Sequence, residues 1–365
     1  MKKILSCMLC LAMLATLLVG CDNSSTDQEG QITLNVYNWG QYISDGGDGS
    51  LDVIAAFEAA YPHIKVNYST YDSNEVMYTK LVGGGITVDV IIPSDYMIAR
   101  MIEEGRLLEL NYDNIPNYQY IAQEFRGMDY DPEEKYTVPY AWGTVGIIYN
   151  TKYVDEADVV GWELMWNEKY DDKILMFDNS RDAFGIAQLM LGYSINTTDE
   201  AELEHCAQLL AQQKPLVQQY VMDQIYDLMQ NEEAWIAACY AGDYVTMAAE
   251  NENLAFYRPE GSFNLFMDAM CIPDCCQQKE AAELFINFLC DPEIAAANMD
   301  WIAYSTPLNR EVMAEYMDPE VLEDPVAYPS QEVMSMGSAY TNLPPAVSRL
   351  MESLFLKARI GRIKS

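Results

Sequence analysis

The sequence predicts an α/β protein of two lobes that form a clamp, with strands crossing between the lobes as a hinge. Strand and helix patterns alternate along the first third of the chain, which is typical of a parallel sheet covered by helices. Two extended stretches, residues 136–150 and 263–273, lie far apart in the sequence and are long enough to pass between lobes. The length of 365 residues also fits two cores better than one.

The first part of the chain carries the clearest alternation. Strands are predicted at residues 33–38, 64–68 and 88–92, and helices at residues 51–61, 74–82 and 96–104. Pro62 stops the first helix, and the run Gly83-Gly84-Gly85 breaks the second, because both residue types interrupt helices. This order predicts a βαβαβ unit.

The later part of the chain continues in the same class. Strands are predicted at residues 174–177 and 235–240, and helices at residues 183–192, 198–213, 280–289 and 344–363. With the two extended stretches as crossings, we expect lobe 1 to comprise residues 31–141 and 267–314. Lobe 2 would then comprise residues 142–266 and 315–365.

The N-terminus predicts export and a membrane anchor. Lys2 and Lys3 precede an uncharged apolar run at residues 4–19, which is too short for a confident membrane span. The run ends in Leu18-Val19-Gly20-Cys21, which resembles a bacterial lipobox. We therefore expect residues 1–20 to be a signal peptide and residues 21–30 a tether lipidated at Cys21, on the outer face of the cell membrane, in the periplasmic space or its equivalent. The alternative is an ordinary secretory signal with a chance cysteine.

Composition excludes several partners and sites. A formal charge of −35 argues against nucleic-acid binding and against a basic patch on anionic lipid. The pairing of the six cysteines beyond Cys21 stays open, and the cluster Cys271, Cys275 and Cys276 is expected to hold buried thiols or one disulfide. The cluster Cys271, Cys275 and Cys276 lacks a second CxxC pair and a nearby His, so no metal site is predicted.

Standard catalytic and nucleotide-binding motifs are missing. The sequence contains no GxSxG, HExxH, GxxxxGK[ST] or GxGxxG pattern. We expect a protein that is not an enzyme and that uses no cofactor. A hydrolase with a carboxylate pair stays open as an alternative, because such an enzyme needs only two suitably placed acids.

An ordered series of short motifs resembles one family of binding proteins. The series comprises Asn38-Trp39-Gly40-Gln41-Tyr42, residues 68–78, 88–96, 139–144, 191–198 and 266–268, and Tyr304-Ser305-Thr306-Pro307. Over residues 31–363 the chain is similar to the spermidine/putrescine-binding lipoproteins of ABC transporters. The resemblance implies a type II periplasmic-binding-protein-like clamp that binds a polyamine between its lobes and delivers it to a membrane permease, as a monomer.

Polyamine chemistry indicates which residues could form the site. Buried ammonium groups need carboxylates, and the methylene stem needs flat apolar or aromatic walls. The resemblance offers as walls and polar contacts Trp39, Tyr42, Ser94, Tyr96, Tyr240, Phe266, Tyr304 and Tyr340. It offers as acids Asp182, Asp243 and Asp268.

Several of these residues have a plain structural alternative. Asp182 and Asp243 each precede or begin a predicted helix and could serve as its N-cap. Trp39, Tyr42 and Phe266 could be ordinary packing residues. Tyr340 aligns less well than the others.

Two positions depart from the family pattern. Gln41 and Asn179 are amides where the family usually has acids. We expect a site with fewer acids than a triamine prefers, which favours putrescine over spermidine. Two other functions stay open: an exported glycoside hydrolase, and a polyamine-sensing lipoprotein without a role in transport.

Overall fold

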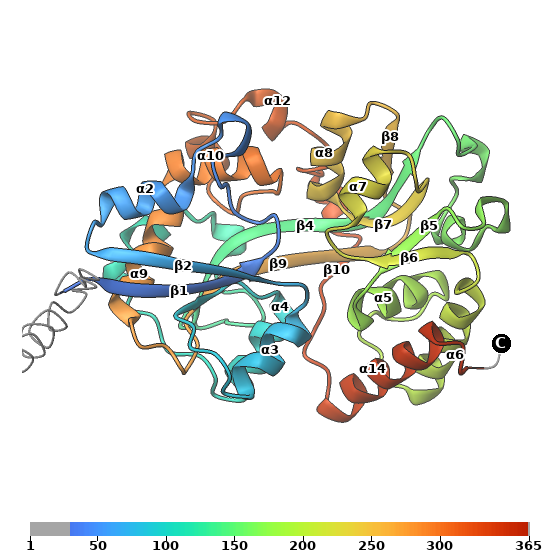
Figure 1. The fold of residues 1–365 in the computed structure, drawn as a ribbon, viewed down its shortest axis with the longest axis horizontal. Coiled ribbons are helices and arrows are strands. Elements are labelled where there is room, and N and C mark those ends of the chain that lie inside the picture. Colours follow the sequence, from blue (N-terminus) through green and yellow to red (C-terminus); the bar gives the residue numbers. More distant parts are fainter. Residues whose placement is uncertain (1–29, 364–365) are drawn as a thin grey trace, which may run out of the picture.

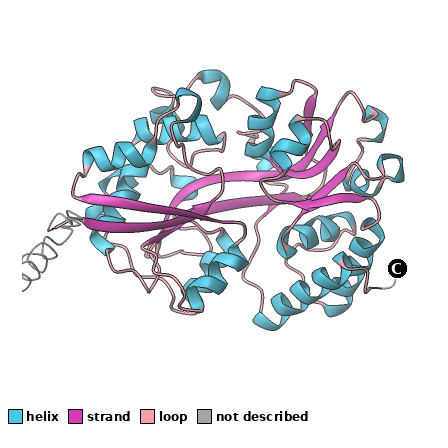
Figure 2. Ribbon diagram, in the orientation of Figure 1, coloured by secondary structure: helices cyan, strands magenta, loops and turns pink. Residues whose placement is uncertain are grey.

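The computed structural model describes residues 30–363. The predicted signal peptide, the lipidation site Cys21 and nearly all of the predicted tether lie outside the described residues. Helices cover the strands on both sides, and two long strands run through the middle of the molecule (Figures 1 and 2). The α/β clamp predicted from the sequence is confirmed.

The strands belong to one hydrogen-bonded network. They are β1 (Ile32–Trp39), β2 (Ile64–Tyr71), β3 (Val90–Ile91), β4 (Thr137–Asn150), β5 (Ile174–Phe177), β6 (Val217–Val221), β7 (Ile236–Tyr240), β8 (Leu254–Tyr257), β9 (Phe263–Cys271) and β10 (Gly337–Ser338). Their order is β2-β1-β3-β9-β4-β7-β5-β6, with β8 paired to β4 and β10 paired to β9.

The α-helices of the described residues are four to fifteen residues long. They are α2 (Val53–Ala60), α3 (Asn74–Val82), α4 (Asp95–Glu103), α5 (Ser180–Met190), α6 (Glu200–Gln213), α7 (Ile225–Gln230), α8 (Ala241–Glu250), α9 (Lys279–Leu289), α10 (Pro292–Ile302), α11 (Arg310–Met313), α12 (Pro319–Leu322), α13 (Gln331–Met334) and α14 (Pro345–Arg359). Short 3-10 turns fill several connections.

The two extended stretches form the hinge. β4 and β9 pair antiparallel from Thr137 opposite Cys271 to Thr144 opposite Leu265, with an irregularity between Pro139 and Ala141. Beyond this segment β4 pairs with β7 and β8 instead. Strands that cross from one end of the molecule to the other are therefore shared by both lobes, as the sequence predicts (Figure 1).

One lobe contains β1, β2 and β3. β1 lies between β2 and β3 and pairs parallel with both. Helices α2, α3, α4 and α9 lie around these strands, and Figure 1 shows them at the end of the molecule away from β5 and β6. We call this the first lobe.

The second lobe contains β5 to β8. β5 pairs parallel with β6 and β7. Helices α5, α6 and α14 pack on one another, and α7 and α8 lie together on the other side of these strands.

Capping side chains determine where several helices begin. Asp52 accepts a hydrogen bond from the Ala55 amide, so α2 begins at Val53 rather than at the predicted residue 51. Asp199 caps α6 in the same way. The predicted helix 183–192 begins three residues earlier, at Ser180, because Asn179 caps it.

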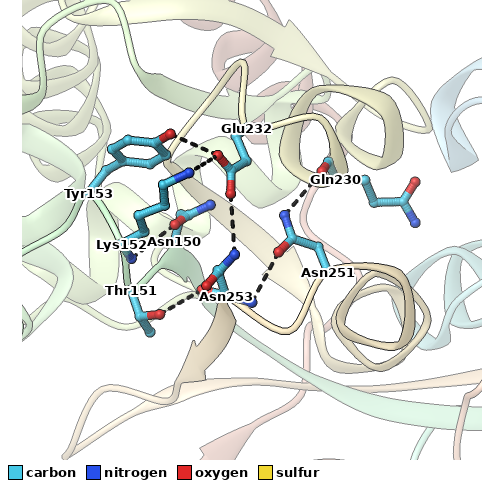
Figure 3. A network of polar contacts seen from close by, with 8 residues as sticks. All are labelled: Asn150, Thr151, Lys152, Tyr153, Gln230, Glu232, Asn251 and Asn253. Atoms are coloured by element: carbon cyan, nitrogen blue, oxygen red, sulfur yellow. Dashed lines mark hydrogen bonds and ion pairs between the residues drawn. The ribbon is translucent and has the colours of Figure 1, made fainter.

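A polar network anchors the outer end of β4 (Figure 3). Glu232 lies at its centre and accepts hydrogen bonds from Lys152 Nζ at 2.8 Å, Tyr153 Oη at 2.7 Å and Asn253 Nδ2 at 3.3 Å. Asn251 Nδ2 donates to the Gln230 carbonyl at 3.0 Å. The network ties the end of the crossing strand to the turn after α7, and so helps to fix that helix in the second lobe.

Three further findings concern anchors, cysteines and metals. Among residues 30–363 no helix is long and apolar enough to span a membrane. The six cysteines of this part of the chain are all free thiols, four of them buried, so the disulfide alternative is not seen there. Within the same range, no three His, Cys, Asp or Glu side chains are placed to hold a metal ion.

Candidate functional site

A cavity of about 80 Å³ lies between the two lobes, beside the crossing strands. One water needs roughly 10–15 Å³ on the same measure, so the cavity has room for a slender molecule. All thirteen predicted site residues line it: Trp39, Gln41, Tyr42, Ser94, Tyr96, Asn179, Asp182, Tyr240, Asp243, Phe266, Asp268, Tyr304 and Tyr340. Their contacts with a ligand stay a prediction.

The carboxyl ends of β1 and β2 form one wall. Trp39 ends β1 and lies opposite Tyr71, which ends β2. Trp39 Nε1 and Tyr71 Oη both donate to the Ile92 carbonyl, at 2.8 and 2.7 Å. The two ring centroids lie 4.8 Å apart. Both rings are therefore held in place by the strand ends and by a shared acceptor.

Asp268 is a buried acid with spare bonding capacity. It lies on β9 and is 4% exposed. Its Oδ2 accepts a hydrogen bond from Tyr42 Oη at 2.7 Å, whereas its Oδ1 has no hydrogen-bond partner among the described residues. Burial raises the pKa of Asp268 to about 6, although the nearby hydroxyls of Ser94 and Tyr42 favour its charged form. A buried carboxylate oxygen without a donor is well suited to accept one from a ligand.

Asp243 lies on the second lobe and accepts two tyrosine hydroxyls. Tyr304 Oη donates to Oδ1 at 2.6 Å and Tyr226 Oη donates to the same oxygen at 2.9 Å. Burial raises the pKa of Asp243 to about 6, although both hydroxyls favour its charged form. The alternative that Asp243 caps the helix is wrong, because α8 begins at Ala241 with Tyr240 as its N-cap.

Asp182 and Asn179 form a local pair at the start of α5. Asn179 is the N-cap, and its Oδ1 accepts from the Asp182 amide at 2.8 Å. Its Nδ2 donates to Asp182 Oδ2 at 2.8 Å, and Tyr240 Oη donates to the same oxygen. Burial raises the pKa of Asp182. The capping alternative for Asp182 is therefore wrong, and Asn179 both caps the helix and orients the acid.

Aromatic rings complete the walls. Tyr42 meets Tyr304 edge-on with ring centroids 4.9 Å apart, and Tyr240 meets Phe266 at 5.5 Å. Phe266 is 7% exposed, so it both packs in the interior and borders the cavity. These rings give the methylene part of a ligand flat faces, and the edge-on packing fixes their orientation.

The structure adds three acids that the sequence analysis missed. Asp72, Glu75 and Asp223 also line the cavity, together with Tyr71 and Tyr226. Glu75 accepts a hydrogen bond from Tyr96 Oη at 2.9 Å, and burial raises its pKa. Asp72 and Glu75 lie within a quoted motif, residues 68–78, which could have signalled them. Asp223 follows β6, where no local pattern marks it.

The electrostatic character of the cavity is strongly negative. Six Asp or Glu side chains line it, and no Lys, Arg or His is among its lining residues. The expectation of a site with fewer acids than a triamine prefers therefore loses its support, because Asp72 after β2, Glu75 of α3 and Asp223 of the β6–α7 loop add acids to those predicted. The ground for favouring putrescine over spermidine is thereby removed.

The arrangement suits binding better than bond cleavage. Four acids each accept a tyrosine hydroxyl on one oxygen, which fixes their positions, and no histidine or cysteine is among the described residues that line the cavity. Acids and aromatic rings around a narrow space are what an organic cation with an apolar stem requires.

Comparison with known proteins agrees with this geometry. The family model described as bacterial extracellular solute-binding protein matches residues 52–328. The chain belongs to this family. The family consists of solute-binding transport proteins rather than enzymes.

Relatives of this solute-binding protein cover almost all of it. The spermidine/putrescine-binding periplasmic protein of Salmonella typhimurium is 30% identical over 331 residues, which are 90% of this chain and 92% of that protein. The solved structure of the spermidine/putrescine ABC transporter substrate-binding protein PotD from Streptococcus pneumoniae, in complex with calcium and HEPES, is 35% identical with a TM-score of 0.73. It covers 91% of this chain and 100% of its own. The Tp0655 (TpPotD) lipoprotein of Treponema pallidum is 27% identical with a TM-score of 0.77, covering 90% of this chain and 99% of its own.

Proposed function

We propose that this protein is the extracytoplasmic binding component of a polyamine ABC importer and that it closes on putrescine or spermidine between its lobes. The observation that carries the proposal is Asp268, whose Oδ1 is buried without a donor in a cavity lined by acids and tyrosines. A ligand ammonium would supply the missing donor. The names of the Salmonella and Streptococcus relatives support the same ligand class.

Calorimetry with each amine tests the proposal. Purified protein is titrated with putrescine and with spermidine at pH 8, and circular dichroism checks that the protein is folded. We expect saturable binding of at least one amine. Folded protein that releases no heat with either amine, and shows no thermal shift with either, would refute the proposal.

The same proposal includes the boundaries of the two lobes and a membrane permease as the partner. Residues 31–141 with 267–314 would form one rigid body, and residues 142–266 with 315–365 the other. The monomer would present both lobes to a membrane permease once the ligand has closed them. Co-purification with a membrane permease that depends on added polyamine would support transport, and its absence would favour a sensor lipoprotein.

The proposed membrane anchor is the lipid on Cys21. The sequence Leu18-Val19-Gly20-Cys21 supports it, and one relative is named a lipoprotein. Replacing Cys21 with Ser in the full chain should move the protein from the membrane fraction to the soluble extracytoplasmic fraction. Metabolic labelling with a radioactive fatty acid should be lost in the same variant.

The glycoside hydrolase alternative has less support. Four of the six cavity acids, Glu75, Asp182, Asp243 and Asp268, accept tyrosine hydroxyls, whereas a hydrolase needs an open cleft with room for a sugar and a water. We propose that the protein has no enzymatic activity. Release of reducing sugar from a panel of oligosaccharides would overturn this part of the proposal.

A further inference from the structure

We infer that Arg181 is a positioning residue that keeps the clamp closed, by joining Tyr96 of the first lobe to Tyr340 behind the wall of the cavity. The inference rests on the proposed function, because it concerns how long a bound ligand is retained. Arg181 is not among the residues that line the cavity.

The guanidinium lies against two rings from different parts of the fold. Arg181 Cζ is 4.2 Å from the ring centroid of Tyr340 and 5.5 Å from that of Tyr96. The two rings meet edge-on, with centroids 5.8 Å apart and an interplanar angle of 85°. Both rings line the cavity. Arg181 therefore contacts the two rings without bordering the ligand space.

Arg181 is an unusual buried charge. It is 4% exposed, and no Asp or Glu of residues 30–363 forms an ion pair with it. Its Nη1 donates to the Ile195 carbonyl at 3.0 Å and its Nη2 to Asn196 Oδ1 at 2.7 Å, while its Nε has no partner in this part of the chain. A buried cation is costly, and the nearby carboxylates of Asp95 and Asp182 together with the negative faces of the rings compensate part of that cost.

Tyr340 is bound to the same lobe as Arg181. The contact between Arg181 and Tyr96 is therefore the one that forms when the lobes close. Tyr340 Oη donates to the Arg181 carbonyl at 3.4 Å, and Arg181 Nη2 donates to the Thr341 carbonyl at 3.3 Å. Tyr340 also packs closely on Gly185 of α5. A Cβ at Gly185 would lie only 2.1 Å from Tyr340 Oη. Tyr96 instead belongs to α4 of the first lobe and leaves when the lobes part.

A second contact across the lobes lies beside this one. Asn342 Nδ2 donates to Glu103 Oε2 of α4 at 2.7 Å. Both contacts of the segment near residue 340 reach the same helix, so α4 meets the second lobe along one edge of the cavity. Removing the Arg181 contact should ease reopening there, because the ring of Tyr96 loses its link to the second lobe.

The test measures ligand release and the stability of the ligand-free protein separately. The variants are R181M, which keeps the stem but removes the charge, and R181K, which keeps the charge but cannot lie flat against two rings. The control is R258M: Arg258 also stacks on rings, those of Phe256 and Phe263, but none of these residues lines the cavity. Stopped-flow tyrosine and tryptophan fluorescence gives the dissociation rates of putrescine and spermidine.

We expect R181M to release the ligand about tenfold faster, which equals about 1.4 kcal/mol in the free energy of binding. The melting temperature of ligand-free R181M should stay within about 4 °C of the wild type, because removing the desolvation cost of a buried charge offsets the lost hydrogen bonds. R258M should release the ligand at the wild-type rate.

Two results would overturn the inference: wild-type release from R181M, or equally accelerated release from R258M. If R181M does not fold, R181K decides the question. Faster release from folded R181K supports the inference, and wild-type release from it overturns it. Failure of the wild-type protein to bind either amine would refute the proposed function instead, and is seen before any variant is made.

Discussion

The substitution Asp268→Asn probes the acid on which the proposed site depends most. The change keeps the size of the side chain and a hydrogen-bonding partner for Tyr42 Oη, which lies 2.7 Å from Asp268 Oδ2. It removes the negative charge. The variant therefore separates the shape of the cavity from its electrostatics.

The structure gives a magnitude for both states of the protein. Burial raises the pKa of Asp268 from 3.8 to about 6, so its charged form destabilises the ligand-free fold at pH 8 by about 3 kcal/mol. Ligand-free D268N should thus melt at a higher temperature than the wild type. Loss of a buried charge partner costs about 2–5 kcal/mol in binding, and the middle of that range corresponds to an affinity roughly 100-fold or more weaker.

Calorimetry and thermal melting at pH 8 measure the two effects. The matched control is Asp227→Asn, since Asp227 is an exposed acid on α7 that does not line the cavity. D227N should bind like the wild type apart from a small change through the long-range field. A folded D268N protein whose affinity stays within about twofold of the wild type would refute the reasoning.

Two more predictions concern pH and steric fit. Affinity should fall about 100-fold from pH 8 to pH 5, because burial raises the pKa of both Asp243 and Asp268 to about 6 and an ammonium needs them charged. These raised pKa values destabilise the ligand-free fold above pH 6, and that destabilisation is lost as the pH falls through 6. As the pH falls from 8 to 5, the contribution of these two groups should therefore raise the melting temperature of the ligand-free protein, while calorimetry shows weaker binding. Equal affinity at pH 5 and pH 8 would contradict this prediction. Gly242→Ala should weaken binding at least about tenfold by overpacking, because a Cβ there would lie 2.4 Å from the ring of Tyr304. Gly85→Ala, with no atom within 4 Å of its Cβ, serves as the control for calorimetry, and equal affinities of the two variants would count against the role of this contact.

The fold was predictable because its signals are local. The alternation of apolar runs and helical patterns is read from a few residues at a time, and β4 and β9 are long apolar stretches with little ambiguity. β6 (Val217–Val221) escaped prediction because Gln218, Gln219 and Tyr220 make it polar and only its two ends are buried. The strand predicted at 88–92 has only two residues, since β3 pairs with β1 at Val90 and Ile91 alone.

The site was only partly predictable, for a different reason. Motifs around Trp39 and Asp268 mark these positions directly. Asp223 and Tyr226 reach the cavity only because the second lobe folds back over the ends of β1 and β2, and no local pattern encodes that approach. The capping role considered for Asp182 belongs to Asn179, whose extended backbone places it at the N-cap of α5.

The crossing strands have a mechanical consequence for whatever docks on the closed protein. Two antiparallel strands joined by a ladder resist stretching and in-plane bending, but they twist easily, and the irregular pairing at Pro139 gives them one soft point. We therefore expect the lobes to rotate chiefly about this ribbon. A docking partner would sense the presence of the ligand as an angle between two surfaces, and would need no contact with the ligand itself.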